Sequence, residues 1–171
     1  SSAFVYGSVA LRSTFNQKSF ADFLQIYQGL KCFDVNLREG QNDIQIVGEF
    51  LRRADFIKLN ESELDKIARH FNIVAEKIEE QIYALVDIIG DKIICITRGD
   101  KHPVLYREGH IYSGQAIQVN VKNTIGAGDA FFAAMINALI NPQFEPITAL
   151  YKASALGSWV ATKEGAQPEY D

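Results

Sequence analysis

The stretch Asn123–Phe132, NTIGAGDAFF, places two glycines around an alanine and follows them at once with an aspartate. Glycines at such a turn allow backbone N–H groups to point at one spot, and the dipole of a following helix adds positive potential there. The apolar run that continues from the turn predicts a helix from Gly128 to about Ile140, buried because it is apolar almost all round. The stretch therefore predicts an anion site at the start of a helix.

Asp129 is unexpected beside an anion site, because two negative charges repel each other. One interpretation is structural, with Asp129 as the N-cap or as an acid in the first turn of the helix. The other is catalytic. In phosphoryl transfer a base accepts the proton of the attacking hydroxyl, and a carboxylate of ordinary acidity is ionised at neutral pH. A neutral hydroxyl would then lie between the carboxylate and the phosphate.

Two familiar phosphate-binding motifs are excluded. The P-loop pattern G-x-x-x-x-G-K-[ST] is absent, and the dinucleotide fingerprint requires a third glycine where Phe131 stands. A Rossmann-type dehydrogenase domain is therefore not expected.

The composition is that of a globular protein that can bury a substantial core. The 171 residues are 47% hydrophobic and 22% charged, with a net charge of −4. The Lys and Arg residues are scattered, so no nucleic-acid partner is expected, and no apolar run is long enough to predict a membrane partner. Cys32 and Cys95 lack metal-type spacing and are weak evidence for a disulfide, so we expect a cytoplasmic protein.

Strand-like and helix-like segments alternate along the chain. Strands are predicted at residues 3–11, 31–37, 55–60 and 92–97, and antiparallel strands with a turn at Glu108-Gly109 within residues 102–119. Helices are predicted at residues 19–29, 43–54, 61–71, 76–90, 128–140 and 146–163. This order predicts one α/β domain over residues 1–171, a three-layer sandwich with a mostly parallel, mixed sheet flanked by helices. Ligands of such sheets bind beyond the carboxyl ends of the strands.

The segment NTIGAGDAFFAAMINAL resembles the second signature of the PfkB (ribokinase-like) sugar kinases, written D-T-x-G-A-G-D. Four more segments resemble this family in the same order: FDVNLR its D-x-N-x-R, KLNESEL its K-x-N-x-x-E-L, ITRGDK its T-x-G-D-K, and ATKEGAQP its closing T-x-x-G-A turn. The likeness covers residues 4–168.

The resemblance implies ATP-dependent transfer of phosphate to a sugar hydroxyl, with fructose as the first candidate acceptor. Kinases for 2-keto-3-deoxygluconate or ribose, and a non-catalytic nucleotide-binding module, remain alternatives. It implies ATP and Mg²⁺ as cofactors and raises a monovalent cation as a third. Asp129 would be the catalytic base, and the backbone of Gly126, Ala127 and Gly128 would hold the migrating phosphoryl group.

By the same resemblance, Asn60 and Glu63 help to organise Mg²⁺ and the nucleotide phosphates, with Glu63 acting on the metal through water. From the residues alone, Asn followed three positions later by Glu predicts a capping box. The two interpretations are compatible, because a capped helix end can still face the site.

The resemblance also implies that Thr97, Gly99 and Lys101 contact the nucleotide and that Ser154 lines the adenine pocket. The alternatives are an ordinary strand-to-turn exit at Thr97 and Gly99 and a solvated Lys101. Two features depart from the family: His102 stands where glycine usually follows T-x-G-D-K, and Ser154 stands where many relatives have asparagine.

Asp34, Asn36 and Arg38 would bind the substrate. The planar guanidinium of Arg38 suits a phosphoryl or sugar oxygen, and the alternative is an ordinary surface arginine.

Complete members of this family are longer, and we expect this chain to be a carboxyl-terminal part that lacks the amino-terminal strands and the lid. The partners expected are a sugar, ATP, and either a second copy or the missing segment, because an uncovered sheet edge tends to pair.

Overall fold

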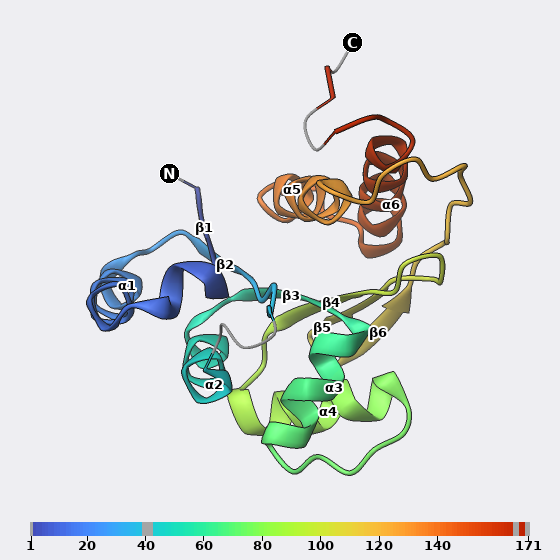
Figure 1. The fold of residues 1–171 in the computed structure, drawn as a ribbon. Coiled ribbons are helices and arrows are strands. Elements are labelled where there is room, and N and C mark those ends of the chain that lie inside the picture. The colour runs from blue at the N-terminus through green and yellow to red at the C-terminus, as the bar shows by residue number, and fades with distance from the viewer. Residues whose placement is uncertain (1, 39–42, 166–167, 170–171) are drawn as a thin grey trace. The chain divides into compact units, whose positions relative to one another are not determined.

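The computed structural model describes residues 2–38, 43–165 and 168–169, in which strands and helices alternate (Figure 1). The strands are β1 (Ala3–Gly7), β2 (Leu30–Asp34), β3 (Phe56–Asn60), β4 (Ile93–Thr97), β5 (Val104–Arg107) and β6 (His110–Ser113). The helices are the 3₁₀-helix η1 (Ser8–Arg12) and the α-helices α1 (Thr14–Ile26), α2 (Ile44–Arg53), α3 (Glu61–His70), α4 (Ile78–Ile89), α5 (Ala127–Leu139) and α6 (Pro146–Ala161).

The six strands form one mixed sheet in which strand order follows chain order, from β1 to β6. β1 pairs in parallel with β2, from Ala3↔Leu30 to Gly7↔Asp34, and β2 pairs in parallel with β3. The two residues between β5 and β6, Glu108 and Gly109, have φ values of 50° and 79°. This is the backbone of a tight two-residue hairpin turn, so β5 and β6 are antiparallel. The predicted fold class is confirmed.

The chain divides into two compact units. The first comprises Ser1–Ile96 and Tyr106–Ile111, and the second comprises Thr97–Leu105 and Tyr112–Asp171.

The first unit packs α1, α2, α3 and α4 against one another in chain order. Right-handed crossovers between successive parallel strands place the connecting helices on the same face of the sheet, and Figure 1 shows α2, α3 and α4 together on one side of β2 and β3. Aromatic rings fill the space near β1: the Tyr6 ring lies 4.8 Å from Phe33, and the Phe4 ring lies 4.6 Å from Phe23. β3 has four buried residues of five, the most of the six strands, and residues 94–96 of β4 are buried as well.

The second unit is built on α5 and α6, which pack closely together. Gly157 of α6 makes this approach possible, because a Cβ at this position would lie 2.9 Å from the carbonyl oxygen of Ala127. The Lys122 and Asn123 N–H groups both donate to the carbonyl of Ala161, at 2.8 and 3.1 Å. These bonds fix the segment that leads into α5 against the end of α6.

The prediction that α5 is buried all round is wrong. Ala130, Phe131, Phe132 and Met135 are buried, whereas other positions of this helix are partly or fully exposed. Some apolar side chains of α5 are therefore not covered by other residues that the structure describes.

Three predicted boundaries also differ. Residues 3–11 are not one strand, because β1 ends at Gly7, opposite the last residue of β2, and η1 follows. α1 begins at Thr14, five residues before the predicted start, because the Ser13 hydroxyl accepts the Asn16 N–H at 3.2 Å and caps the helix. Residues 114–119 form no strand.

Candidate active site

The turn before α5 has the geometry of an open helix N-terminus. Gly126 is the N-cap residue in the left-handed conformation, with φ 83° and ψ −15°, and it provides no side chain to cap the helix. The Ala127 N–H bonds to the Thr124 carbonyl at 3.3 Å, and the Ala130 N–H bonds to the Gly126 carbonyl at 2.9 Å. The N–H groups of Gly128 and Asp129 lie between them and precede the first intrahelical donor. They are therefore available to an anion.

Asp129 is the third residue of α5 and is exposed. The N-cap interpretation of Asp129 is wrong, because Gly126 holds that position, and the structure makes Asp129 an acid of the first turn. Among the described residues no hydrogen bond or ion pair engages its carboxylate. The carboxylate is open to solvent, and the helix dipole favours its negative charge.

The segment Thr97–Lys101 leaves β4 through a glycine turn in the same unit. Thr97 ends the strand, Gly99 has φ 63°, and the Lys101 N–H closes the turn on the Arg98 carbonyl at 3.1 Å. No heavy atom lies within 4 Å of a Cβ built on Gly99. Backbone conformation, rather than crowding, is therefore what favours glycine at this position.

His102, which stands where the family usually has glycine, contacts the residues that follow β6. His102 Nδ1 lies 2.8 Å from the Gly114 carbonyl oxygen, and the Gly114 N–H donates to the Pro103 carbonyl at 2.8 Å. The same Nδ1 also lies 3.3 Å from the Ala116 nitrogen. One ring nitrogen cannot both donate and accept, and the shorter contact favours a tautomer that carries the proton on Nδ1. Together these bonds tie the end of the glycine turn to the residues after β6.

Ser154 lies within α6 and is only 8% exposed. A ligand that reaches this serine would contact a small part of its surface.

In the first unit, Asn60 and Glu63 form the capping box that the sequence predicts. Asn60 Oδ1 accepts the Glu63 N–H at 2.9 Å, and Glu63 Oε2 accepts the Asn60 N–H at 2.7 Å. The second oxygen, Glu63 Oε1, accepts the N–H of Leu37 at 2.8 Å, from the loop that follows β2. Both carboxylate oxygens are therefore engaged by backbone donors.

Burial raises the pKa of the Glu63 carboxyl, and the nearby Asp34 charge raises it further. Hydrogen bonds from Asn60 and Leu37 and the positive charge of Lys58 oppose this effect.

Lys58 and Asp34 form a buried ion pair that the sequence reasoning missed. Lys58 Nζ lies 3.0 Å from Asp34 Oδ1, and the two side chains are 11% and 12% exposed. Lys58 is the lysine of the K-x-N pattern, but no local spacing links it to an aspartate 24 residues away. One oxygen of the Asp34 carboxylate therefore binds Lys58 and links β2 to β3.

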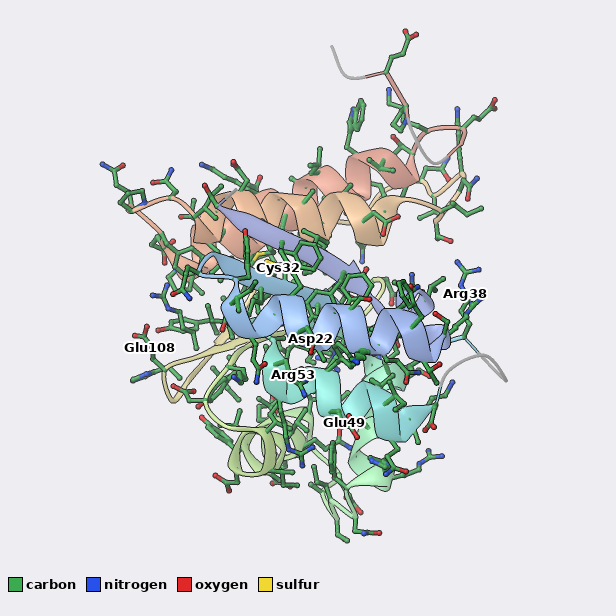
Figure 2. The ribbon with its side chains drawn as sticks, turned by 90° about the vertical axis from the view of Figure 1, so that its left-hand side faces the viewer. Asp22, Cys32, Arg38, Glu49, Arg53 and Glu108 are labelled. Carbon is green, nitrogen blue, oxygen red and sulfur yellow. The ribbon has the colours of Figure 1, made fainter. Side chains whose placement is uncertain are left out.

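Asn36 and Arg38 follow Asp34, and both are exposed. Asn36 has a left-handed backbone, with φ 40°. Arg38 extends outward from the ribbon in Figure 2. The structure thus brings Asp34, Asn36, Arg38, Asn60 and Glu63 together at the carboxyl ends of β2 and β3. The second unit contains Thr97, Gly99, Lys101, Asp129 and Ser154.

Within the described residues, no group of three or more His, Cys, Asp or Glu side chains could hold a metal ion. Of the helices in this part of the chain, none is long and apolar enough to cross a membrane. Both cysteines are free and buried.

Comparison with known proteins gives one family. The model of the pfkB family of carbohydrate kinases matches residues 1–171. A Pyrococcus horikoshii protein assigned as a sugar kinase is 28% identical in an alignment of length 170 that covers 94% of this chain and 50% of that protein. Rice fructokinase-1 is 25% identical in an alignment of length 179 that covers 96% of this chain and 54% of that protein. The chain therefore spans about half the length of these curated relatives.

Solved structures share the fold. A fructokinase of Vibrio cholerae, with fructose, ADP and calcium bound, superposes with a TM-score of 0.83 at 22% identity and covers 96% of this chain and 56% of its own. A ribokinase of Thermotoga maritima gives a TM-score of 0.78 at 20% identity, over 97% of this chain and 52% of its own.

Proposed function

The chain belongs to the pfkB family of carbohydrate kinases, and we propose on that premise that it takes part in ATP-dependent transfer of phosphate to a sugar hydroxyl. The observation that carries the proposal is the start of α5. An uncapped helix N-terminus presents the Gly128 and Asp129 N–H groups, and an exposed carboxylate stands in the same turn.

In this proposal the backbone of that turn and the Asp129 side chain have different roles. The free backbone N–H groups of Gly128 and Asp129 bind the migrating phosphoryl group, where a helix N-terminus stabilises the charge that builds on its oxygens. The Asp129 carboxylate accepts the proton of the sugar hydroxyl as that oxygen attacks phosphorus. Gly157 keeps the Ala127 end of α5 close to α6 and so fixes the direction of these donors.

ATP supplies the phosphoryl group, and Thr97, Gly99, Lys101 and Ser154 are proposed to hold the nucleotide. The left-handed backbone of Gly99 and the tie from His102 to Gly114 support a shaped loop at this position. In proteins Mg²⁺ is usually held by one or two carboxylates together with substrate phosphates and water. Glu63 and Asn60 offer oxygen atoms of this kind, although Glu63 is buried and already accepts two N–H bonds.

Fructose is the proposed acceptor, with Asp34, Asn36 and Arg38 on its side of the reaction. The proposal draws support from the fructokinases among the relatives and from the fructose bound in the Vibrio cholerae structure. The ribokinase among the structural neighbours keeps ribose as an alternative, and 2-keto-3-deoxygluconate remains a second alternative.

The deciding experiment is Asp129→Asn in the natural protein that contains this chain. Sugar-dependent ADP formation should fall by about 10²- to 10⁴-fold, while ATP affinity, measured by calorimetry, stays within about twofold. Asp87→Asn, at an exposed position of α4, is the matched control and should leave turnover unchanged. Equal turnover in wild type and Asp129→Asn would remove Asp129 from the reaction, whereas ATP binding without any turnover in the wild type would favour a non-catalytic nucleotide-binding module.

The isolated 171-residue chain is proposed to bind Mg²⁺·ATP weakly and to transfer phosphate poorly or not at all. Robust sugar-dependent ADP release by this chain would overturn that part of the proposal. A thermal shift with ATP and none with NAD would separate a kinase from a dehydrogenase domain.

The outer edge of β1 is proposed as a contact surface for a second copy or for further strands of a longer chain. β1 is the first strand in the sheet order, so within the part of the chain that the structure describes it has a neighbour on one side only, and Val5 is 53% exposed. An open edge of this kind tends to pair with another strand. Light scattering that shows a monodisperse monomer at high concentration would count against self-association.

A further inference from the structure

The turn that follows β2, residues 35–38, is held by Lys58 of the neighbouring strand β3. The Lys58 ammonium binds Asp34 Oδ1 at 3.0 Å, and the Lys58 carbonyl accepts the Val35 N–H at 3.1 Å. One residue of β3 thus fixes both the side chain and the backbone at the start of the turn.

Two further side chains fix the second half of the same turn. The Ser8 hydroxyl donates to the Asn36 carbonyl at 3.0 Å, and Glu63 Oε1 accepts the Leu37 N–H at 2.8 Å. Ser8 comes from η1 and Glu63 from α3, so three separate elements hold four consecutive residues of the chain.

The three side chains that hold this turn are buried, whereas Asn36 within the turn is exposed. Ser8, Glu63 and Lys58 are 1%, 5% and 8% exposed, whereas Asn36 is exposed and has φ 40°. A left-handed backbone costs free energy in residues other than glycine and persists where the surroundings determine it. The buried contacts are therefore what hold Asn36 in this conformation.

We propose that Glu63 is a positioning residue: by bonding the Asn60 and Leu37 N–H groups with its two oxygens, it ties the start of α3 to the turn and sets how Asn36 and Arg38 are presented. Ser8 acts on the same turn from the opposite side. The structural part of this inference stands independently, and its consequence for turnover rests on the proposed kinase function.

A positioning role and a metal role make different demands on the Glu63 side chain. A carboxylate that orients a metal through water acts by its charge, which Glu63→Asp keeps. A carboxylate that bridges two N–H groups acts by its reach, which Glu63→Asp shortens by one methylene. Ser8→Ala removes a buried hydroxyl that donates to the Asn36 carbonyl, so it changes the turn without changing any charge.

The first measurement is amide hydrogen exchange of the isolated chain. Exchange at Leu37 should be about tenfold faster or more in both Glu63→Gln and Glu63→Asp, because a hydrogen bond to a charged acceptor is lost. Glu79→Gln, the same chemical change at an exposed position in the first turn of α4, should leave Leu37 unchanged. Leu37 exchange equal to wild type in a folded Glu63 variant would overturn the proposal.

The second measurement is turnover of the natural protein that contains this chain. Ser8→Ala and Glu63→Asp should both lower kcat/KM for the sugar at least fivefold, with the apparent Mg²⁺ affinity within twofold of wild type. A Ser8→Ala variant with wild-type kinetics, or a Glu63→Asp variant that loses only Mg²⁺ affinity, would overturn the positioning role. Absence of turnover in the wild type would refute the proposed kinase function instead, and the exchange experiment would still decide the role of Glu63. If Glu63→Gln does not fold, Glu63→Asp supplies both readouts.

Discussion

The Lys58 ammonium lies 3.0 Å from the Asp34 carboxylate, and both side chains are almost fully withdrawn from solvent. Removing one partner leaves a buried charge without its counterion. We therefore expect Lys58→Met to lower the free energy of unfolding by about 3–5 kcal/mol, measured by urea denaturation. The double variant Lys58→Met/Asp34→Asn should recover much of that loss, because it leaves no uncompensated charge. A single variant within about 1 kcal/mol of wild type would show that the pair is accessible to water in solution.

Gly157→Ala should destabilise the protein by about 1–3 kcal/mol, because the new methyl group would meet the Ala127 carbonyl oxygen at 2.9 Å and backbone cannot yield as a side chain can. The same change should weaken ATP binding, since it moves the start of α5. Gly48→Ala in α2 is the control, because its nearest contact is the tip of the Phe71 ring at 3.0 Å. Chemical denaturation and calorimetric ATP titration check both effects, and unchanged ATP affinity in a folded Gly157→Ala would contradict the second.

Glu145 caps α6 and should stabilise it in a pH-dependent way. Its carboxylate accepts the N–H groups of Ile147 and Thr148, and hydrogen bonds, chiefly from Thr148, lower the pKa of Glu145. A lowered folded-state pKa gives stability that is present above the unfolded value of about 4.3 and is lost as pH falls through the folded value. Glu145→Ala should therefore have a lower Tm than wild type at pH 7, and the two melting curves should converge in acid. A Tm difference that persists unchanged at pH 2 would assign the effect to packing.

Substitutions at Asn36 should separate its backbone from its side chain. Asn36→Ala should cost about 1 kcal/mol, because alanine disfavours the left-handed conformation that asparagine tolerates, whereas Asn36→Gly should be within about 0.5 kcal/mol of wild type. Asn72, with φ 56°, is the matched control. Alanine at either position should reduce stability in urea, but only changes at Asn36, glycine included, should reduce turnover. A fully active Asn36→Gly would remove the Asn36 side chain from the reaction.

Local signals in the sequence predicted much of the framework. The spacing of Asn60 and Glu63 predicted a capping box, which is present, and Gly90 ends α4 as its C-cap residue. The apolar run predicted β4 and the turn at Glu108-Gly109 predicted the β5–β6 hairpin, although β6 ends at Ser113, before the predicted end at residue 119. The N-cap at Ser13 was also readable from the sequence but was overlooked, which misplaced the start of α1.

What the sequence could not supply were contacts between distant segments. Lys58 meets Asp34 across 24 residues and Glu63 meets Leu37 across 26, and no periodicity links such positions. β1 stops at Gly7 because its partner strand stops, a limit set by the neighbour rather than by β1 itself. The assigned roles of the nucleotide residues remain predictions. The closing turn that resembles the family also includes Ala166, which lies outside the described residues.

The coincidence of strand order with chain order has a consequence for how this protein acquires its structure. Each new strand of β1–β4 emerges next to the one just completed, with one or two helices in each connection, so every pairing joins strands that are consecutive in the chain. Mixed α/β topologies of this kind fold at rates between those of helical bundles and those of all-β barrels. We therefore expect β1–β4 to pair one after another as they leave the ribosome, without waiting for distant segments.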